Sequence, residues 1–561
     1  MASNTHVVIA SDLVRVFKGS GRHTSTVRAV NGISLQIRAG ELTALVGPDG
    51  AGKTTLQRLI AGLYLPTSGG LKVLDTDITS DPQSVQNRIS YMPQRFGLYE
   101  DLSVQENLDL YADLHAVDPK IRQERFARLL EITDLAKFTQ RPAGKLSGGM
   151  KQKLGLACTL VRSPELLLLD EPSVGVDPLS RRDLWQIIEQ LVKEENLSVI
   201  ISTAYMDEAE RCSRIYVMYQ GRVLSEGSVQ ELRSHANQLT WQVTPPPGVK
   251  ARTLQSGLLE NRNQIIDAVP KGAAVRFICT PGNTSFALEQ DATPREPELE
   301  DGVMVLLHQA QQQADQQPAT VAADNIDAKT SLTDHPEGPV IIVRDLVRTF
   351  GDFTAVASTS FEVRRGEIFG LLGPNGAGKT TTFRMLCGLL PASSGHLEVA
   401  GMNLRTARAK ARAKIGYVSQ KFALYGNLTV RENMTFFGGA YGLSGRFLND
   451  RTEATLSQFS LPPEAISGEL PGGFKQRLSM AVALIHQPEI VFLDEPTSGI
   501  DPLARRAFWY TIGQLANQGI TVIVTTHFME EAEYCDRIAI QDAGKVLALG
   551  TPAEVREKAG L

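Results

Sequence analysis

Two glycine-rich segments that end in Lys-Thr-Thr stand out in the chain, GPDGAGKTT at 47–55 and GPNGAGKTT at 373–381. Each follows an apolar run and precedes a helix-like stretch, which is the context of a phosphate-binding loop. Glycines let backbone N–H groups face phosphate oxygens, and the N-terminus of the following helix adds positive potential. We therefore predict that Lys53 and Lys379 reach the β- and γ-phosphates of a nucleotide.

An apolar run that ends in Asp-Glu also occurs twice, at Asp170-Glu171 and at Asp494-Glu495. The aspartate of such a pair can hold the Mg²⁺ shell, and the glutamate can orient the attacking water or accept its proton. The candidate catalytic carboxylates are therefore Glu171 and Glu495. In each copy the candidate metal ligands are this aspartate, a threonine hydroxyl of the loop, and a glutamine that follows a tyrosine-containing strand. These residues are Thr54, Gln94, Asp170, Thr380, Gln420 and Asp494.

Both motifs belong to one long repeat. LSGGMKQKL also returns as LPGGFKQRL, and the blocks recur in order with a period of roughly 325 residues, which indicates a duplicated domain. Within each copy, short apolar runs alternate with longer helical patterns, which predicts a layered α/β domain with a mainly parallel sheet. The predicted division is a first domain at 5–234, a small module at 235–308, a flexible linker at 309–338 and a second domain at 339–561.

The composition is that of a folded, intracellular protein. Of the 561 residues, 42% are hydrophobic and 21% are charged, and the formal net charge of −5 provides no broad basic field for nucleic acid. The five cysteines show neither metal-ligand pairs nor a disulfide-like framework. The start of the chain lacks the features of a secretory signal, and no window approaches the ~20 apolar residues that cross a bilayer. We expect any role at a membrane to be peripheral.

Taken together and in this order, these blocks resemble the ATP-binding cassette (ABC) family over both halves of the chain. The LSGG-type segment at 146–150 separates such cassettes from other phosphate-loop enzymes. The resemblance implies two P-loop NTPase domains of ABC type, each with a mainly parallel sheet core, a helical subdomain and an antiparallel β subdomain, joined by a small α+β module and the linker. It also implies ATP and Mg²⁺ as cofactors, and intramolecular head-to-tail pairing of the two cassettes, with each ATP between one phosphate loop and the other LSGG-type segment.

The predicted nucleotide contacts follow from the two loops and from this resemblance. Phe17 and Phe350 stand before the loops, where an aromatic ring could stack on adenine, although an ordinary core position explains each equally well. The loop residues are Gly47, Gly50, Gly52, Lys53, Thr54, Thr55, Gly373, Asn375, Gly376, Gly378, Lys379, Thr380 and Thr381. The residues of the LSGG-type segments are Ser147, Gly148, Gly149, Gly472 and Gly473.

The two predicted ATP sites are not equivalent. His527 in VTTHFMEEAE aligns with Ala204 in ISTAYMDEAE, although a shift of one residue would offer Tyr205 instead. In the family this histidine contacts the γ-phosphate, which makes His527 the third catalytic candidate. Pro471 replaces Ser147, and we expect it at the first position of a helix, where proline is tolerated. Head-to-tail pairing would bring both losses to the nucleotide held by Lys53.

The chain looks most like the ATPase subunits of bacterial multidrug efflux systems. REPELEDGVMVLLHQ at 295–309 resembles the ending of a small regulatory domain in such proteins. The expected partners are separate transmembrane permease subunits, two and non-identical because the copies differ, with the chain cytoplasmic and peripheral on the inner face of the membrane. The candidate coupling surfaces are 96–102 and 422–428, unless these residues pack inside the helical subdomain. A tandem cassette acting on ribosomes and the ATPase of a sugar importer are the alternatives.

Overall fold

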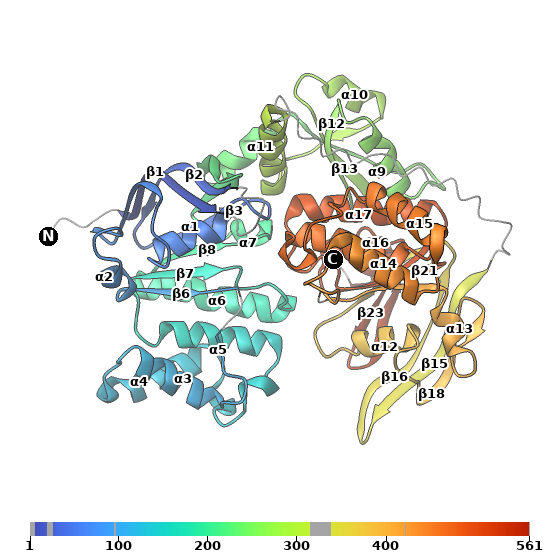
Figure 1. Cartoon of the computed structure of the whole chain (residues 1–561), viewed down its shortest axis with the longest axis horizontal. Coiled ribbons are helices and arrows are strands. Elements are labelled where there is room, and N and C mark those ends of the chain that lie inside the picture. The colour runs from blue at the N-terminus through green and yellow to red at the C-terminus, as the bar shows by residue number, and fades with distance from the viewer. Residues whose placement is uncertain (1–5, 19–25, 95–96, 315–337, 421, 560–561) are drawn as a thin grey trace. The chain divides into compact units, whose positions relative to one another are not determined.

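The computed structural model describes residues 6–18, 26–94, 97–314, 338–420 and 422–559. The chain forms two compact units. The first consists of Met1–Asn237 and Pro297–Ala314, and the second of Gln238–Glu296 and Asp315–Leu561. Each unit contains one copy of the repeat (Figure 1).

The first cassette is built around a six-stranded sheet of order β10-β9-β3-β8-β7-β6, in which only the pair β9 and β10 is antiparallel. Every residue of β3, β7 and β8 is buried, as expected for parallel strands covered on both faces. A second, antiparallel sheet has the order β2-β1-β4-β5. The strands are β1 (His6–Lys18), β2 (Thr26–Arg38), β3 (Leu42–Val46), β4 (Ser68–Val73), β5 (Thr76–Asp77), β6 (Ile89–Met92), β7 (Leu166–Asp170), β8 (Ser198–Ser202), β9 (Arg214–Tyr219) and β10 (Arg222–Gly227).

Some helices of the first unit cover the large sheet, and others form a separate helical subdomain. The subdomain helix α3 begins with a capping box, in which the Ser103 hydroxyl accepts from Glu106 N and the Glu106 carboxylate accepts from Ser103 N. The helices of this unit are α1 (Lys53–Ile60), α2 (Pro82–Gln86), α3 (Val104–Leu114), α4 (Pro119–Ile132), α5 (Gly148–Leu160), α6 (Pro178–Glu195), α7 (Met206–Ala209), α8 (Val229–Arg233) and α11 (Leu299–Ala314).

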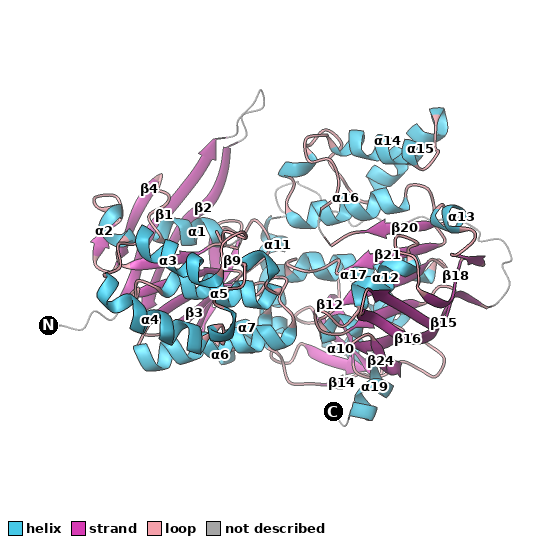
Figure 2. Cartoon of the chain, turned by 90° about the horizontal axis from the view of Figure 1, so that it is seen from below, coloured by secondary structure: helices cyan, strands magenta, loops and turns pink. Residues whose placement is uncertain are grey.

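The second cassette repeats this architecture, with one sheet of order β20-β21-β22-β17-β23-β24 and another of order β16-β15-β18-β19. Figure 2 shows α14, α15 and α16 gathered beyond β20 and β21 as the helical subdomain. The strands are β15 (Pro339–Phe350), β16 (Phe353–Arg364), β17 (Ile368–Leu372), β18 (Ser394–Val399), β19 (Met402–Asn403), β20 (Ile415–Val418), β21 (Ile490–Asp494), β22 (Thr521–Thr526), β23 (Arg537–Asp542) and β24 (Lys545–Gly550). The helices are α12 (Lys379–Leu386), α13 (Arg408–Arg412), α14 (Val430–Ala440), α15 (Gly445–Gln458), α16 (Gly472–Leu484), α17 (Pro502–Asn517), α18 (Met529–Ala532) and α19 (Pro552–Ala559). The predicted α/β fold with two cassettes is confirmed.

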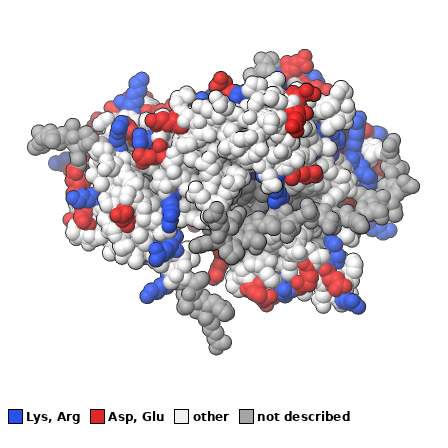
Figure 3. Space-filling model, turned by 90° about the horizontal axis from the view of Figure 1, so that it is seen from above, with Lys and Arg blue, Asp and Glu red and all other residues white. Residues whose placement is uncertain are grey.

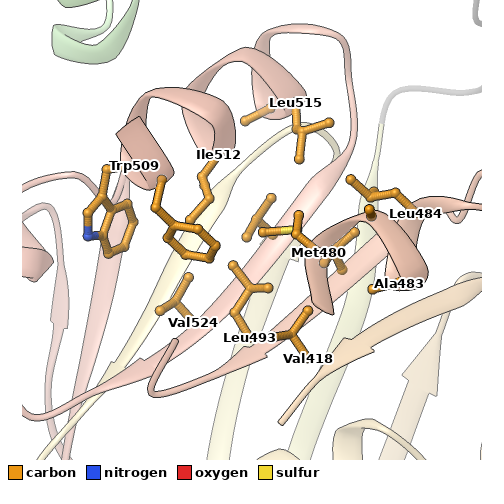
Figure 4. Close-up of a cluster of buried hydrophobic side chains, with 14 of the residues drawn as sticks. Val418, Met480, Ala483, Leu484, Leu493, Trp509, Ile512, Leu515 and Val524 are labelled. Carbon is orange, nitrogen blue, oxygen red and sulfur yellow. The ribbon is translucent and has the colours of Figure 1, made fainter. Parts of the chain in front are cut away.

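The largest core cluster of the second cassette lies between the sheet and the helices α16 and α17. Figure 4 shows Met480, Leu493 and Ile512 packed together there. Trp509 is also buried in this cluster, and its ring stacks on Tyr534 with 4.8 Å between the centroids. This stacking joins α17 to the segment between α18 and β23, which follows His527 in the chain.

An intervening module, Gln238–Glu296, belongs to the second unit although the chain enters it from the first cassette. It has an antiparallel sheet of order β12-β13-β11-β14. Its elements are β11 (Thr240–Val243), α9 (Ala251–Glu260), β12 (Ile265–Lys271), β13 (Ala274–Cys279), α10 (Thr284–Glu289) and β14 (Thr293–Pro294). The module that we expected at 235–308 is therefore divided between the two units. Its middle part, Gln238–Glu296, belongs to the second unit, whereas α11 packs on α8 in the first unit.

The expected linker at 309–338 begins inside α11, which continues to Ala314, and residues 315–337 lie outside the described part of the chain. Among the described residues, every helix is too short or too polar to cross a membrane. On the face drawn in Figure 3, acidic and basic side chains are interspersed. All five cysteines are buried free thiols.

Candidate nucleotide sites

Each phosphate loop leaves the carboxyl end of a central strand and enters a helix. Gly47 follows β3 and Gly373 follows β17, and both have a φ of 149°. A Cβ atom at either position would lie 2.1 Å from a backbone carbonyl oxygen, that of Met218 or of Gln541. Only glycine fits there, because neither the φ value nor the space accommodates a side chain.

The two loop lysines are buried inside their own loops. Lys53 Nζ donates to the carbonyl oxygens of Gly47 at 2.7 Å and Pro48 at 3.1 Å. Lys379 Nζ makes the equivalent bonds to Gly373 at 2.5 Å and Pro374 at 2.9 Å. Each ammonium therefore lies within the curl of backbone that would cradle phosphate oxygens.

The structure brings the predicted metal ligands of the first site together. The Thr54 hydroxyl donates to Asp170 Oδ1 at 3.0 Å, and the Ser202 hydroxyl donates to the same atom at 2.7 Å. In the second site, the Thr525 hydroxyl donates to Asp494 Oδ1 at 2.6 Å. Burial raises the pKa of Asp494, and the charge of Glu495 adds to this effect, while the Thr525 hydrogen bond opposes it.

The two candidate glutamines lie beside the candidate bases. Gln94 Nε2 donates to Glu171 Oε2 at 2.6 Å, and Gln420 Nε2 donates to Glu495 Oε2 at 2.7 Å. Each glutamine therefore joins the end of one strand of the large sheet to the candidate base that follows the neighbouring strand. This hydrogen bond is a contact that sequence reasoning did not predict.

Both candidate bases have a strained backbone, with φ of 49° at Glu171 and 44° at Glu495. Side chains of L-residues rarely adopt this left-handed region, and such strain is concentrated at functional sites. A neighbouring strand holds the strained residue in place, because Glu171 N donates to Ser202 and Glu495 N donates to Thr525. These backbone bonds hold each glutamate at the carboxyl end of its own strand.

In the part of the chain that the structure describes, a histidine lies beside the candidate base of the second site. His527 Nδ1 lies 3.2 Å from Glu495 Oε1, and the imidazole is 1% exposed. Burial alone would raise the pKa of Glu495, but the hydrogen bond and charge of His527, together with Lys379, lower it. Both ring nitrogens of His527 are buried and lack a well-aligned hydrogen bond in the described part of the chain; Nδ1 has the ion-pair contact with Glu495, whereas Nε2 has no such contact. A phosphate oxygen would satisfy this atom.

Matching hydrogen bonds identify the counterpart of His527 in the first site. Thr203 donates to Glu208 at 2.6 Å and accepts from Tyr205 N at 3.0 Å. In the second copy, Thr526 donates to Glu531 at 2.5 Å and accepts from Phe528 N at 3.0 Å. Ala204 therefore occupies the position of His527, and Tyr205 occupies that of Phe528.

The buried glutamates in these networks were missed from the sequence. Glu208 and Glu531 anchor the threonine that precedes each switch position, and burial raises the pKa of both carboxyls. The Glu-Ala-Glu segment shared by the two copies was their only signal, because nothing in one sequence distinguishes a buried glutamate from an exposed one.

The LSGG-type segments form the N-termini of α5 and α16, and begin the helices at Gly148 and Gly472. Ser147 is the N-cap of α5, and its hydroxyl accepts from Met150 N at 3.2 Å. Pro471 is the N-cap of α16 and makes no side-chain cap bond. Our expectation that Pro471 occupies the first helical position is therefore wrong by one residue, because a proline can also precede the first turn without blocking a hydrogen bond.

The two aromatic candidates differ in exposure. Phe17 is half-buried and packs edge-on against Tyr64, with 5.5 Å between the ring centroids. Phe350 is 46% exposed, and the guanidinium of Arg348 lies 4.5 Å from its ring centroid. Both rings therefore lie against an arginine, since the guanidinium of Arg15 is 4.8 Å from the ring centroid of Phe17, and Phe17 has the additional contact with Tyr64.

The donor groups fit a magnesium nucleotide. Hydroxyl and carboxylate oxygens, the ligands that Mg²⁺ prefers, lie side by side at Thr54 and Asp170. Lysine, backbone N–H groups and a helix N-terminus supply positive potential for phosphates. The orphaned Nε2 of His527 adds a further donor or acceptor at the second site.

Comparisons with known proteins agree with this chemistry. The sequence model of a family described as "ABC transporter" matches residues 30–174 and 356–498. The probable multidrug ABC transporter ATP-binding protein YbhF of Escherichia coli (strain K12) is 46% identical over 562 residues, which cover 99% of this chain and 94% of that protein. The linearmycin resistance ATP-binding protein LnrL of Bacillus subtilis (strain 168) is 43% identical over 219 residues, 38% of this chain and 70% of LnrL.

A solved structure described as the ATP binding subunit of an ABC transporter is similar to part of the chain. It aligns with 41% of this chain and 92% of its own, at 27% identity and a TM-score of 0.36. The sequence matches are more extensive, since one family model matches both copies and one relative matches nearly the whole length.

Proposed function

This chain belongs to the ABC transporter family of ATPases, and on that basis we propose that it powers an exporter of drugs or other small molecules. The membrane-spanning permease subunits are then separate polypeptides, and the chain binds to them at the inner face of the membrane. The near-full-length similarity to a probable multidrug ATP-binding protein supports this proposal over a ribosomal or sugar-importing role.

The permease subunits are proposed to be two and non-identical, because the two helical subdomains present different surfaces. Tyr425 is 48% exposed, and its ring lies 5.0 Å from that of Phe436, which is 50% exposed. The first copy has Leu110 in place of Phe436. Of the proposed coupling surface at 96–102, Phe96 lies outside the described residues, whereas all of 422–428 is described.

The two cassettes are proposed to pair head to tail within one chain, so that one ATP site is hydrolytic and the other mainly holds nucleotide. The hydrolytic site combines Lys379, Glu495 and His527 with Ser147 of the other cassette. The second ATP is bound by Lys53 opposite Pro471. The observation that carries this asymmetry is the 3.2 Å contact between His527 and Glu495, which Ala204 cannot make in the first copy.

The hydrolytic residues act in sequence on the bound nucleotide. Lys379 and the loop N–H groups bind the phosphates, and Glu495, held by Gln420 and by its strained backbone, orients a water and accepts its proton. His527 fixes the carboxylate and offers Nε2 to the γ-phosphate. Mg²⁺, held by Thr380 and Asp494, would neutralise developing charge on the phosphate oxygens.

Steady-state ATPase rates of two matched variants test the proposal. We expect Glu495→Gln to lower kcat by about 100-fold or more, because an amide cannot accept the proton. Glu171→Gln should change the rate by less than about two-fold, since the first site contributes little turnover. Equal losses in the two variants would rule out the asymmetry.

Purification from solubilised membranes tests the transport role. We expect two different integral membrane proteins to co-purify with the tagged chain. Recovery with ribosomes and without a membrane protein would instead identify the alternative function.

A further inference from the structure

The intervening module is held on the second cassette, not on the cassette that precedes it in the sequence. Its helix α9 packs on α17, which the green and orange ribbons of Figure 1 show side by side. Val269 of β12 joins the core cluster of the second cassette that contains Trp509 and Tyr534. The contact therefore includes apolar burial as well as polar bonds.

Arg252 of α9 is the centre of the polar contact. Its side chain is only 7% exposed. Its guanidinium donates to Gly366 O at 2.8 Å and to Asn517 Oδ1 at 3.1 Å, and it also pairs with the Asp536 carboxylate. A buried guanidinium with all three acceptors on the second cassette is a specific contact, because an unsatisfied arginine would be costly at this depth.

Asp536 connects this arginine to the nucleotide site. Its Oδ2 accepts from Ile368 N at 3.0 Å, and its own N–H donates to Ile368 O at 2.8 Å. Ile368 begins β17, the strand that ends at the phosphate loop. Residues 527–536 join β22 to β23, and we call them the switch segment. This segment begins with His527 and ends with Asp536.

Two more contacts hold the same half of the switch segment. Gly272 N donates to Glu533 Oε2 at 2.7 Å. Asp267 pairs with Arg506 at 3.1 Å, and Arg506 donates to the Tyr534 hydroxyl at 2.6 Å. The module thus binds directly or through Arg506 to three residues of the switch segment.

The first cassette lacks the central acceptor. Ser213 stands at the position of Asp536, as Ser213 N donates to Leu42 O at 2.9 Å in the way that Asp536 N donates to Ile368 O. Serine carries no charge to pair with a buried arginine. The docking site is therefore a feature of the second copy, the copy with the complete catalytic set.

We propose that the intervening module is a built-in positioning element for hydrolysis in the second cassette. Arg252, acting through Asp536, is a positioning residue that holds the switch segment in register with the strand leading to the phosphate loop. The imidazole of His527 is then held in contact with the carboxylate of Glu495, because the switch segment is fixed in one conformation. This inference rests on the proposed function, because it assigns turnover to the second site.

The test compares variants of the full-length chain. Asp536→Ser copies the residue of the first cassette and is compatible with this fold, and Arg252→Ala removes the other partner. We expect either change to lower kcat for ATP about ten-fold while the KM changes less than about two-fold, because misplaced catalytic groups slow the chemistry more than binding. The double variant should lose less than the combined loss of the two single variants, since both variants break the same Arg252–Asp536 pair.

Lys250→Ala is the matched control. Lys250 lies on the same module, and its Nζ is 3.3 Å from the same Asp536 carboxylate, but its side chain is 50% exposed. Its loss should change kcat by less than about two-fold, because exposed ion pairs contribute little. An equal loss in this control would show that the effect is not specific to the buried arginine, which would overturn the role of Arg252.

Hydrogen exchange of residues 527–536 separates this inference from the proposed function. In Arg252→Ala these amides should exchange about ten-fold faster, whichever site hydrolyses ATP. Unchanged exchange together with unchanged kcat would overturn the positioning role. A wild-type rate in Glu495→Gln would instead refute the site asymmetry, and the exchange result would still decide whether Arg252 holds the switch segment.

Discussion

His527 Nδ1 lies 3.2 Å from Glu495 Oε1, although 32 positions of sequence separate the two residues. The strands explain this contact, because β21 and β22 are parallel neighbours that pair Asp494 with Thr525. The next residues of both strands emerge at the same carboxyl edge of the sheet, where ligands bind in such folds. In the first cassette the equivalent strands pair Asp170 with Ser202, and the position of His527 is taken by Ala204, which has no polar side chain.

Replacement of the switch histidine tests this contact directly. We expect His527→Ala to lower kcat by about 100-fold, because one lost electrostatic contact to the reacting phosphate costs about 3 kcal/mol. The measurement is the steady-state ATPase rate of the full-length chain. Tyr205→Phe in the first cassette is the control, and it should retain the wild-type rate because the structure assigns the switch position to Ala204. A large loss in that variant would contradict the register.

The buried carboxyl of Glu531 predicts a pH-dependent stability. Burial raises its pKa, and bonds from Thr497 and Thr526 only partly oppose this effect. The folded protein therefore binds this proton more tightly than the unfolded chain, so the contribution of Glu531 to stability is lost as pH rises through the folded pKa. Glu531→Gln should raise the free energy of unfolding on the order of 1 kcal/mol at alkaline pH, with a gain that shrinks as pH falls toward the ordinary glutamate pKa.

Thermal unfolding without nucleotide at several pH values measures this effect. Glu530→Gln is the matched control, since Glu530 is the preceding residue and is exposed. Its replacement should change stability by less than about 0.5 kcal/mol at every pH. A gain that is independent of pH in Glu531→Gln would refute the titration.

Replacement of the two N-cap residues, Ser147 and Pro471, by alanine should have unequal effects on the ATPase rate. Ser147→Ala should lower the ATPase rate by about 10- to 100-fold, because the proposed pairing places this hydroxyl at the hydrolytic site. It should also cost about 1 kcal/mol of stability through the lost cap bond to Met150 N. Pro471→Ala should leave the rate within about two-fold of wild type. A larger loss from the Pro471 variant would overturn the assignment of Ser147 to the active site.

The fold and the nucleotide loops were predictable because their signals are local. A backbone position with a φ of 149° beside a carbonyl oxygen, as at Gly47, accepts only glycine, so this structural requirement is visible in the sequence. The cap position of Pro471 was wrong by one residue, because proline fits on either side of the helix start.

The amino-acid sequence by itself determined that this protein has two phosphate-binding cassettes and that only the later copy has a switch histidine. Repetition made both conclusions possible, because each copy served as the reference for the other. The tertiary structure decided which cassette holds the intervening module. The position of the module depends on the contact between the buried Arg252 and Asp536, which are 284 positions apart. The order of residues along the chain does not reveal such a contact. Side-chain burial and charge pairing over long separations are set only when the chain has folded.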